Sequence, residues 1–427
     1  MHEMKYSGIE WIGEIPKDWK LKRIQFCLNE INEKNIPIKT RQVLSLVKDK
    51  GVMLYEDKGN QGNKAKEDIS QYKIAYPNTL IINSMNILIG SVGISNYLGC
   101  VSPVYYVFKE NEYSDLRYIN YIFNTREFQK ELRKYANGIL EIRLRVSSYD
   151  IFKRKIPLPN KTTQEKIANF LDMKCSEIDK LHLKIEKQIE ILTEYKKAII
   201  TKAVTKGLNS NNEMKDSKNQ WIGKIPIHWD IYKYKHLAYL VRGGSPRPAG
   251  NPIYYYGNIP FMKISDITKD DKMYVDSCEG SIKPAGLSNT RMVKKGTLLL
   301  TNSGATLGIP KILNINSTIN DGIAAFLNID DKLDTKFAYY SLKSKTDYFL
   351  QVAALGMGQP NLNTEIIGNT YVAIPPKYEQ QEIIKYLEKK CTEIDSAIED
   401  KKMQMQTLEQ YKKSLIYEYV TGKKEVR

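Results

Sequence analysis

The chain repeats itself over most of its length, and this duplication constrains its fold more than any other feature. Three segments of the first half return in the second half at a spacing of about 210 to 216 residues. They are Glu10–Trp19, Ile167–Asp179 and Glu194–Ile200, which return as Gln220–Trp229, Ile383–Asp395 and Gln410–Ile416. A period this long exceeds that of a solenoid repeat, so each copy is a whole domain with an appended segment. We expect the two copies to fold as a pseudo-dimer within one chain.

The composition bounds the class of protein. A chain of 427 residues has room for two or three domains with their own cores. Its 42% hydrophobic and 27% charged residues are typical of a globular protein rather than a disordered one. The formal charge of +16 favours a polyanionic partner, most simply nucleic acid. The alternative is that the charge reflects only a lysine-rich soluble protein.

The five cysteines are scattered, without a C-x-x-C pair. This pattern indicates reduced thiols in a cytoplasmic protein and argues against a zinc site or a disulfide framework. Cys175 and Cys391 occupy equivalent places in the two copies. We interpret them as small buried residues on matching helices. No segment has the apolar length of a membrane helix, and the N-terminus lacks a signal-peptide pattern.

The order of the segments predicts an α+β protein with two tandem α/β domains. Each domain is followed by a long helix, and we expect the two helices to form an antiparallel coiled coil with pseudo-two-fold symmetry. The predicted boundaries are a first domain at 1–158, a first helix at 159–208, a linker at 209–219, a second domain at 220–376 and a second helix at 377–427.

Heptad spacing supports the pairing of the two long helices. The first heptad position holds Ile178, Ile185, Leu192 and Ile199 in one copy and Ile394, Lys401, Leu408 and Leu415 in the other. The residues three places later would complete the seam, namely Leu181, Gln188 and Tyr195, then Ala397, Gln404 and Tyr411. Gln188 and Gln404 would form polar layers that fix the register. The alternative is that each helix packs only on its own domain.

Within the domains, short β-branched and aromatic runs predict strands, and apolar periodicity predicts helices. Expected strands are Val43–Val47, Val101–Phe108, Leu298–Thr301 and Thr370–Ile374, with further buried strands between Ile81 and Ile94. Expected helices are Leu116–Tyr135 and Lys336–Leu350.

Motifs for catalysis are not found in the sequence. Asn251–Tyr254 lacks the second proline of the Asn-Pro-Pro-Tyr motif of amino-methyltransferases, and no glycine-rich cofactor loop precedes it. There is no phosphate-binding G-x-x-x-x-G-K-[ST] loop, and none of the four histidines pairs at metal-ligand spacing. We therefore expect a non-catalytic chain without a cofactor-binding or metal site of its own.

The residues best suited to read DNA lie on polar loops in the parts that differ between the copies. Arginine makes paired hydrogen bonds to guanine and Asn or Gln to adenine, while Lys and Ser mostly contact phosphates. Any one of these loops could instead be an ordinary turn, because Gly, Asn and Ser are turn residues. The candidates in the first domain are Asn60, Gln61, Asn63, Lys64, Ser84, Asn86, Arg143, Arg145 and Ser147. Those in the second are Arg242, Ser245, Arg247, Asn302, Ser303, Thr306, Gln359, Asn361 and Asn363. We also expect the glycines between Arg242 and Arg247 to let the backbone approach a ligand.

Taken together, these features resemble the specificity subunit of Type I restriction–modification enzymes. The resemblance covers almost the whole chain. It rests on the duplicated segments Trp11–Pro16 and Trp221–Pro226, on Ile156–Asp179 and Ile374–Asp395, and on Gly99–Tyr106, Leu299–Thr306, Asn320–Ala325 and Gly358–Asn363. The first domain departs from the second where Ser84-Met-Asn86 replaces the Ser303-Gly-Ala-Thr306 pattern.

The resemblance implies a DNA-binding chain that addresses other subunits to a bipartite site on double-stranded DNA. Its two target recognition domains would be held apart by the helices. Methyltransferase subunits, two per chain, would bind S-adenosylmethionine, and a restriction or motor subunit would use ATP and Mg. The alternatives are a stand-alone DNA-binding regulator and an interaction protein whose coiled coil is the functional part.

Overall fold

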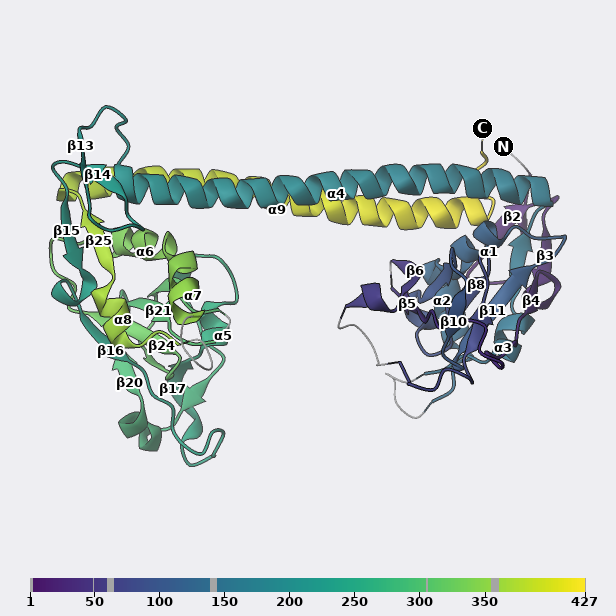
Figure 1. The fold of residues 1–427 in the computed structure, drawn as a ribbon, viewed down its shortest axis with the longest axis horizontal. Helices are drawn as coiled ribbons and strands as arrows, with labels where there is room; N and C mark the ends of the chain where they lie inside the picture. The colour runs from purple at the N-terminus through teal and green to yellow at the C-terminus, as the bar shows by residue number, and fades with distance from the viewer. Residues whose placement is uncertain are drawn as a thin grey trace. The chain divides into compact units, whose positions relative to one another are not determined.

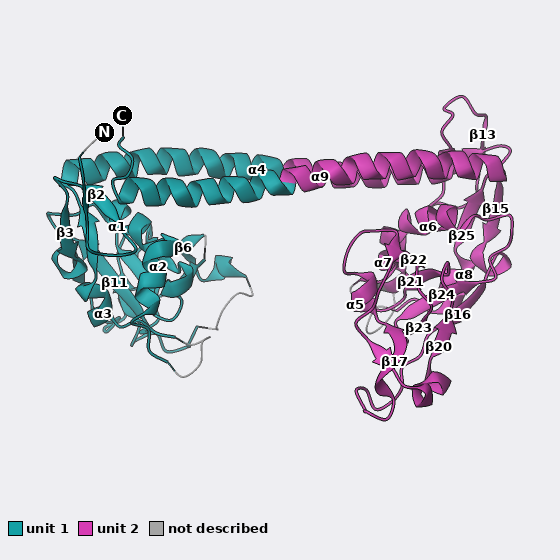
Figure 2. Ribbon diagram, turned by 180° about the vertical axis from the view of Figure 1, so that it is seen from behind, with its two compact units in different colours: residues 1–186, 402–427 teal, residues 187–401 magenta. Residues whose placement is uncertain are grey.

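The computed structural model describes residues 3–48, 50–59, 65–138, 144–304, 306–354 and 361–426. It divides into two compact units (Figure 2). Unit 1 comprises residues 1–186 and 402–427, and unit 2 comprises residues 187–401. The division falls within the two long helices, α4 (Lys161–Lys206) and α9 (Lys377–Val420). The C-terminal end of the chain therefore belongs to the first unit.

Unit 1 is built around a four-stranded antiparallel sheet with the order β4-β11-β8-β9. Its strands are β1 (Met4–Tyr6), β2 (Glu14–Pro16), β3 (Lys20–Arg23), β4 (Leu28–Glu30), β5 (Leu44–Val47), β6 (Gly51–Leu54), β7 (Lys73–Ala75), β8 (Leu80–Asn83), β9 (Val92–Ile94), β10 (Gly99–Val101), β11 (Tyr105–Glu110) and β12 (Lys155–Leu158). Its short helices are α1 (Leu116–Phe123), α2 (Arg126–Arg133) and α3 (Ser148–Lys153). The pairs β1–β2, β3–β12, β5–β6 and β7–β10 complete the unit.

Unit 2 contains a five-stranded sheet with the order β16-β24-β21-β22-β18 and a second sheet with the order β19-β17-β23-β20. Its strands are β13 (Met214–Asp216), β14 (Lys224–Pro226), β15 (Asp230–Lys233), β16 (Tyr239–Arg242), β17 (Tyr255–Met262), β18 (Tyr274–Val275), β19 (Ser281–Ile282), β20 (Arg291–Val293), β21 (Leu298–Thr301), β22 (Pro310–Leu313), β23 (Ser317–Ile319), β24 (Ile323–Leu327) and β25 (Tyr371–Ile374). Its short helices are α5 (Ile264–Ile267), α6 (Thr335–Lys343), α7 (Thr346–Ala354) and α8 (Thr364–Asn369).

The two units share a scaffold, as the duplication predicts. The order β4-β11-β8-β9 of unit 1 matches β16-β24-β21-β22 of unit 2, and the pairs β1–β2 and β3–β12 match β13–β14 and β15–β25. Strand β13 lies inside the segment 209–219 that the sequence assigns to a linker, so the repeated part already begins at Met4 and Met214. The predicted α+β class is confirmed.

The expected helices Leu116–Tyr135 and Lys336–Leu350 are each two helices. In unit 1 the break falls at Thr125, whose side chain accepts a hydrogen bond from the Phe128 N–H and so caps α2. The first amides of a helix have no carbonyl partner within that helix, and the side chain of an N-terminal threonine can accept a hydrogen bond from one of them. Thr125 therefore marks the start of a new helix. The break between α6 and α7 falls at the equivalent place in unit 2.

Both long helices contribute to the core of each unit. In unit 1, Ile178 of α4 belongs to the same apolar cluster as Leu415 and Val420 of α9. In unit 2, the cluster joins Val204 of α4 to Ile383 of α9. The first part of each helix thus packs beside the last part of the other, so the helices run antiparallel, as predicted (Figure 1). The alternative that each helix packs only on its own domain is wrong.

The predicted seam is right at its first heptad position and mostly wrong at its second, where Gln188 and Ala397 are half-buried and the other four residues are exposed. Ile178, Ile199, Ile394 and Leu415 are buried, but Leu181, Tyr195, Gln404 and Tyr411 are exposed. The buried or half-buried residues lie four places after the first position rather than three, namely His182, Ile189, Lys196 and Ala203, then Ile398, Met405 and Lys412. The apolar pattern predicts Tyr195 and Tyr411 in the seam and leaves out Lys196 and Lys412, because lysine usually lies on the surface.

The lysines of the seam are accommodated by ion pairs at equivalent positions. The Lys412 ammonium lies 2.6 Å from an Asp179 carboxylate oxygen in unit 1, and Lys196 lies 2.7 Å from Asp395 in unit 2. Lys196 also binds Asp271 at 2.8 Å. Burial disfavours the charge of Lys196, but its hydrogen bonds with Asp271 and Asp395 outweigh that cost and raise its pKa. These charged layers join α4 to α9 at one equivalent place in each unit.

We expect Lys196→Met to destabilise unit 2 more than Lys412→Met destabilises unit 1. The Lys196 side chain is 9% exposed and holds two carboxylates, whereas Lys412 is 29% exposed and holds one. We expect a loss of about 1–2 kcal/mol for the first variant and below about 1 kcal/mol for the second. Calorimetric unfolding of the two variants measures the difference. Equal losses would contradict the asymmetry.

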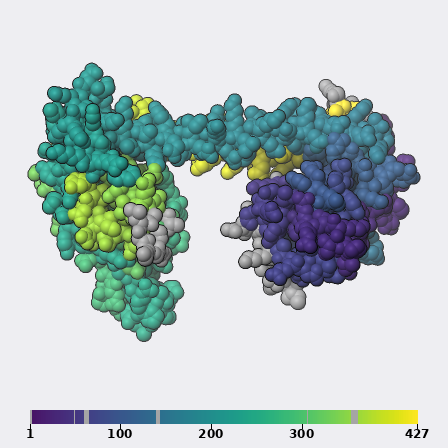
Figure 3. Space-filling model, viewed as in Figure 1, coloured from purple at the N-terminus to yellow at the C-terminus, as the bar shows by residue number. Residues whose placement is uncertain are grey.

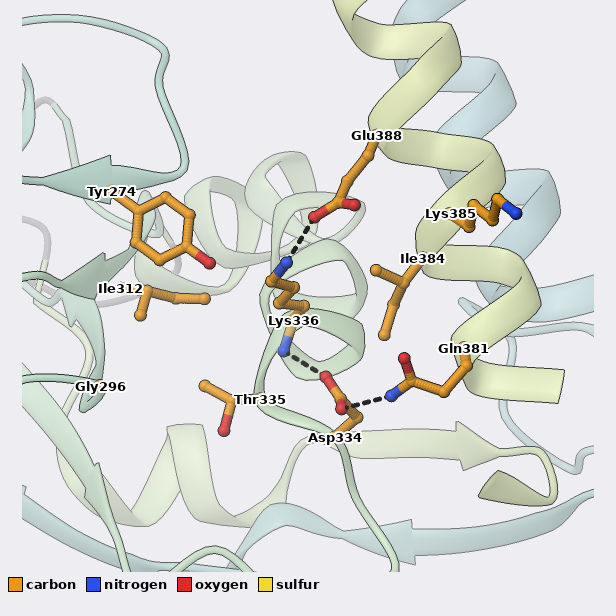
Figure 4. A pocket seen from close by; sticks show the side chains of 10 residues that line it. All are labelled: Tyr274, Gly296, Ile312, Asp334, Thr335, Lys336, Gln381, Ile384, Lys385 and Glu388. Atoms are coloured by element: carbon orange, nitrogen blue, oxygen red, sulfur yellow. Dashed lines mark hydrogen bonds and ion pairs between the residues drawn. The ribbon is translucent and has the colours of Figure 1, made fainter. Parts of the chain in front are cut away.

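The junctions between domain and helix are also repeated. The buried Gln164 side chain accepts from the Asp115 N–H and donates to Pro159 O, and Gln380 does the same with Asp334 and Pro375. A charged pair adds to each junction, Arg117–Asp172 at 2.9 Å in unit 1 and Lys336–Glu388 at 2.7 Å in unit 2. Figure 4 shows the second pair at the side of a hollow of about 430 Å³, with Gln381 bound to Asp334.

Candidate DNA interface

In unit 2, three of the predicted loops meet at the turn Asn320–Gly322, which precedes β24. The Asn302 N–H donates to Gly322 O at 2.9 Å, and the Ser245 hydroxyl donates to Asp321 Oδ1 at 2.7 Å. The third loop joins through Asn361, which forms a β-bridge with Ser303. Segments that are up to about 120 residues apart in the sequence therefore form one surface.

The first of these loops, Arg242–Arg247, is held against the turn by both arginines. Arg242 Nε donates to Asp321 O at 2.6 Å, and Arg247 Nη2 lies 3.4 Å from Asp321 Oδ2. Both arginine side chains remain exposed, Arg247 to 71%. The structure thus places these two predicted residues together, with Ser245, around one residue, Asp321.

The glycines of this loop lie close to backbone atoms of neighbouring segments. A Cβ atom on Gly243 would lie 2.2 Å from Asn320 O, and one on Gly244 would lie 2.3 Å from Asn289 O. Both distances are shorter than any tolerated contact, so only glycine fits. The glycines let the loop approach the protein's own backbone, and the expectation that they also let it approach a ligand stays a prediction.

The remaining predicted residues of unit 2 have mixed surroundings. Thr306 and Asn361 are exposed, Ser303 is half-buried, and Asn363 caps α8 by accepting from the Ile366 N–H at 2.7 Å. Asn302 is fully buried, and neither end of its side-chain amide has a partner among the described residues. Asn302 therefore lies beneath the candidate surface rather than on it.

In unit 1, two of the predicted loops lie side by side. The Val146 N–H donates to Ser84 O at 3.1 Å, and Arg145 Nη2 lies 3.7 Å from the Met85 sulfur. The Ser84 hydroxyl is buried and donates to Val104 O at 2.7 Å, so its role is to hold the loop in place. Asn86 and Arg145 are exposed.

Ser147 caps α3, with its hydroxyl 3.0 Å from the Asp150 N–H. Asn60, Gln61, Asn63, Lys64, Arg143 and Gln359 lie outside the described residues.

The two candidate surfaces occupy the same end of the shared sheet. Ser84 follows β8 and Asn302 follows the matching strand β21, while Val104 and Gly322 precede the matching strands β11 and β24. The loops that leave this end differ in sequence between the units. Equivalent scaffolds thus carry different polar side chains at equivalent places.

Two residues of this region, Asp321 and Tyr256, are not among the DNA contacts that the sequence predicts. Asp321 lies in a segment that the sequence singles out, but a carboxylate is not an expected DNA contact. Tyr256 is 73% exposed and has a φ of +63°, a conformation that is costly for a non-glycine residue. Its neighbour Tyr255 is buried, donates its hydroxyl to Pro246 O at 2.7 Å, and has its pKa raised by burial. No pattern in the sequence distinguishes the two tyrosines.

The described residues hold no group of three or more His, Cys, Asp or Glu side chains arranged to bind a metal ion. All five cysteines are free, and Cys175 and Cys391 are buried, as interpreted from their equivalent positions. In the part of the chain that the structure describes, no helix has the length and apolar character needed to cross a bilayer.

Comparisons with known proteins agree with the resemblance. Residues 226–404 match the family model described as type I restriction modification DNA specificity domain. The type I restriction enzyme MjaVIII specificity subunit of Methanocaldococcus jannaschii is 26% identical over 358 residues, which cover 81% of this chain and 77% of that protein. A second chain of that organism, with the provisional name type I restriction enzyme MjaX specificity subunit, is 26% identical, and the match covers 97% of this chain and 96% of that protein.

The fold has a counterpart among solved structures. A chain from a structure described under complex assembly and conformational transition of the type I R-M system superposes with a TM-score of 0.67. The identity is 14%, and the match covers 95% of this chain and 98% of that chain, so it shows a common fold over the whole length. Together with the duplicated sequence segments and the two equivalent candidate surfaces, these matches show that residues 226–404 are similar to the type I DNA specificity domain and that most of the chain is similar to type I restriction enzyme specificity subunits.

Proposed function

We propose that this chain is the sequence-specific DNA-binding subunit that directs methyltransferase and restriction subunits to a bipartite site on double-stranded DNA. The observation that carries the proposal is the pair of equivalent sheet ends with different loops. One scaffold used twice with unlike polar side chains suits the recognition of two unlike half-sites. The net charge of +16 suits a polyanionic target.

The continuous helices α4 and α9 are the proposed ruler between the half-sites. Helices of 46 and 44 residues, joined by an ion pair in each unit, have a defined length, so the spacer should be constant. Half-sites read on one face of the duplex lie about one helical turn, or roughly 10 bp, apart.

The catalytic activities are assigned to the partners. We propose that two methyltransferase subunits, which would bind S-adenosylmethionine, dock on the repeated junctions between domain and helix. The duplicated Gln164 and Gln380 and the ion pairs beside them offer two equivalent places. A restriction or motor subunit would supply the ATP- and Mg-dependent steps. The sequence supports a non-catalytic role, because it carries neither an Asn-Pro-Pro-Tyr motif nor a nucleotide loop.

Base-resolution methylation of DNA from cells that express the chain with its methyltransferase subunit tests this proposal. We expect one methylated adenine in each of two unlike half-sites, on opposite strands, at a constant spacer. Cells with the methyltransferase alone are the control and should show no such site. Methylation by the purified chain with S-adenosylmethionine, or a single uninterrupted target, would contradict the proposal.

The two other functions differ in simple measurements. A stand-alone regulator should not form a stoichiometric complex with the methyltransferase in size-exclusion chromatography. An interaction protein that acts only through its helices should leave no specific footprint on DNA at any salt concentration. The matches to specificity subunits favour neither alternative.

A further inference from the structure

We propose that Asp321 is a positioning residue that holds Arg242 and Arg247 so that the arginines read guanine in the second half-site. This inference rests on the proposed function and names the base that the surface of unit 2 recognises. Strands β17 and β20 lie at the end of unit 2 remote from α4 and α9 (Figure 1), and the same end is formed by the teal-green segment in Figure 3. The loop Arg242–Arg247 packs against residues 289 and 319–323 in this part of the unit.

The two terminal nitrogens of Arg242, Nη1 and Nη2, are available as hydrogen-bond donors. Arg242 ends β16, where it pairs with Ala324, and its Nε donates to Asp321 O at 2.6 Å. Among the residues that the structure describes, no group accepts from its Nη1 or Nη2. The side chain is exposed. A guanidinium bound through Nε is fixed in its plane, while its two terminal nitrogens face outward as a coplanar pair of donors.

Both oxygens of the Asp321 carboxylate contact the loop. Oδ1 accepts from the Ser245 hydroxyl at 2.7 Å, and Oδ2 faces Arg247 Nη2 at 3.4 Å. One residue thus holds Arg242 through its backbone carbonyl and Arg247 through its side chain. Its carboxylate is directed at Ser245 and Arg247, so it holds the loop in place, and these contacts partly neutralise its charge.

The backbone of the loop is fixed before any ligand arrives. The Gly243 N–H donates to Ile323 O at 2.9 Å, the Gly244 N–H donates to Ile319 O at 3.1 Å, and the Tyr255 hydroxyl donates to Pro246 O at 2.7 Å. A site whose supporting groups are already bound loses less conformational entropy on binding and keeps its donors within a narrow geometry. Such geometry is needed to discriminate between bases.

Guanine is the base that fits a coplanar pair of donors. In the major groove it presents two acceptors, O6 and N7, whereas adenine presents one acceptor and one donor. A phosphate could also accept from an arginine fork. A neighbouring carboxylate weakens the attraction of both arginines for a phosphate but leaves their directed hydrogen bonds intact, so the presence of Asp321 favours base reading. The many lysines of the chain remain for the phosphates.

The first test replaces single guanines of the second half-site with 7-deazaguanine, which lacks the N7 acceptor. Binding is measured for the complex of the chain with its methyltransferase subunits, after the target has been mapped by methylation. We expect one substitution to weaken binding by roughly five- to a hundredfold. Arg242→Lys, which keeps the charge but loses the planar fork, should weaken binding to natural DNA similarly and should be indifferent to 7-deazaguanine at that position.

The matched control is Arg291→Lys, on strand β20 of the second sheet of unit 2. Arg291 is exposed, and no described residue binds its guanidinium. This variant should keep the sensitivity to 7-deazaguanine at the guanine that Arg242 reads. The first half-site is the internal control, because 7-deazaguanine there should act alike on wild type and on Arg242→Lys.

Asp321→Asn tests the positioning role separately. The asparagine keeps the size of the side chain, the backbone carbonyl for Arg242 and an acceptor for Ser245, but it removes the charge that faces Arg247. We expect affinity for unrelated DNA to rise while the ratio of specific to non-specific affinity falls at least threefold. A purely structural role would leave that ratio unchanged. The thermal unfolding of the variant shows whether its fold is intact.

Three results would overturn the inference while leaving the proposed function intact. The mapped second half-site could contain no guanine on either strand, or binding could be unchanged by 7-deazaguanine at every position of that half-site. In the third result, Arg242→Lys and 7-deazaguanine would lower the affinity additively. If the complex shows no sequence-specific binding at all, the proposed function fails as well. The two failures are distinguishable, because the first still shows a bipartite methylated site.

Discussion

Deletion of residues 402–427 is expected to unfold the first unit, although the deleted segment is the last part of the chain. Leu415, Ile416 and Val420 are buried in the same cluster as Trp11 and Trp19. The loss of three buried aliphatic side chains costs on the order of 5–9 kcal/mol, which is comparable with the whole stability of a domain. The buried Tyr118 hydroxyl would also lose Val420 O, to which it donates at 2.8 Å.

Hydrogen exchange of the truncated chain measures this effect, because it reports the two units separately. We expect protection to be lost in residues 4–158 and to persist in the recognition part of unit 2. A reading of the chain as consecutive domains predicts the opposite, namely that the first domain stays folded when everything after residue 376 is removed. An intact first unit in the truncated chain would contradict the fold described for unit 1.

A matched pair of point variants separates this effect from general damage to the helices. Val420 and Val204 occupy equivalent places at the ends of α9 and α4, and both are buried. Replacement by alanine removes two methyl groups and leaves a cavity, at a cost of about 2 kcal/mol. Val420→Ala should lower the stability of unit 1, and Val204→Ala that of unit 2.

Lys345→Met is expected to stabilise unit 2 at pH 7. Lys345 lies between α6 and α7, is buried, and has only the Ser341 carbonyl and hydroxyl as described partners, at 3.0 and 2.8 Å. Burial without a carboxylate lowers its pKa from 10.5 to about 7. Each pKa unit corresponds to about 1.4 kcal/mol, and the lost hydrogen bonds offset part of the gain, so we expect a net stabilisation of roughly 2–4 kcal/mol.

The stability advantage of Lys345→Met should depend on pH, and the pKa shift of Lys345 predicts the direction of that dependence. The unfolded chain protonates Lys345 below about pH 10.5, whereas the folded chain protonates it only near pH 7. Between these values the unfolded state binds more protons, so the lysine makes stability fall as the pH falls from 10.5 to 7. Urea unfolding of wild type and Lys345→Met from pH 7 to 9.5 should show the advantage of the variant shrinking with rising pH. A constant difference would show that Lys345 is charged in the folded state.

The candidate surfaces were partly predictable from the sequence. Polar loops with Arg, Asn and Ser mark where the chain leaves the regular elements, and most of the described candidates lie at one end of each sheet. Ser84 and Asn302 lie in the interior, because the residue that follows a buried strand is placed by the sheet and not by its own polarity. Asp321 was not predictable as a partner of Arg242, since about 80 residues separate them and only the pairing of β16 with β24 brings them together.

The sequence by itself determined the duplication, the two long helices, their antiparallel pairing and the α+β class. Heptad spacing and alternating apolar residues are local patterns that a short window of the chain contains, and the duplication is found by comparing such windows along the chain. Such patterns specify which helices and strands form and that the arrangement occurs twice in the chain.

The tertiary structure alone decided which residues face the seam and which parts of the chain share a core. Local pattern placed Tyr195 and Tyr411 inside and Lys196 and Lys412 outside, and the reverse holds, because each lysine meets an aspartate from the other helix more than 190 residues away. A charge can be buried only where such a partner exists. Likewise, the end of α9 completes unit 1 because its apolar face packs on Trp19 and Tyr118, a contact between distant segments that no local window of the sequence contains.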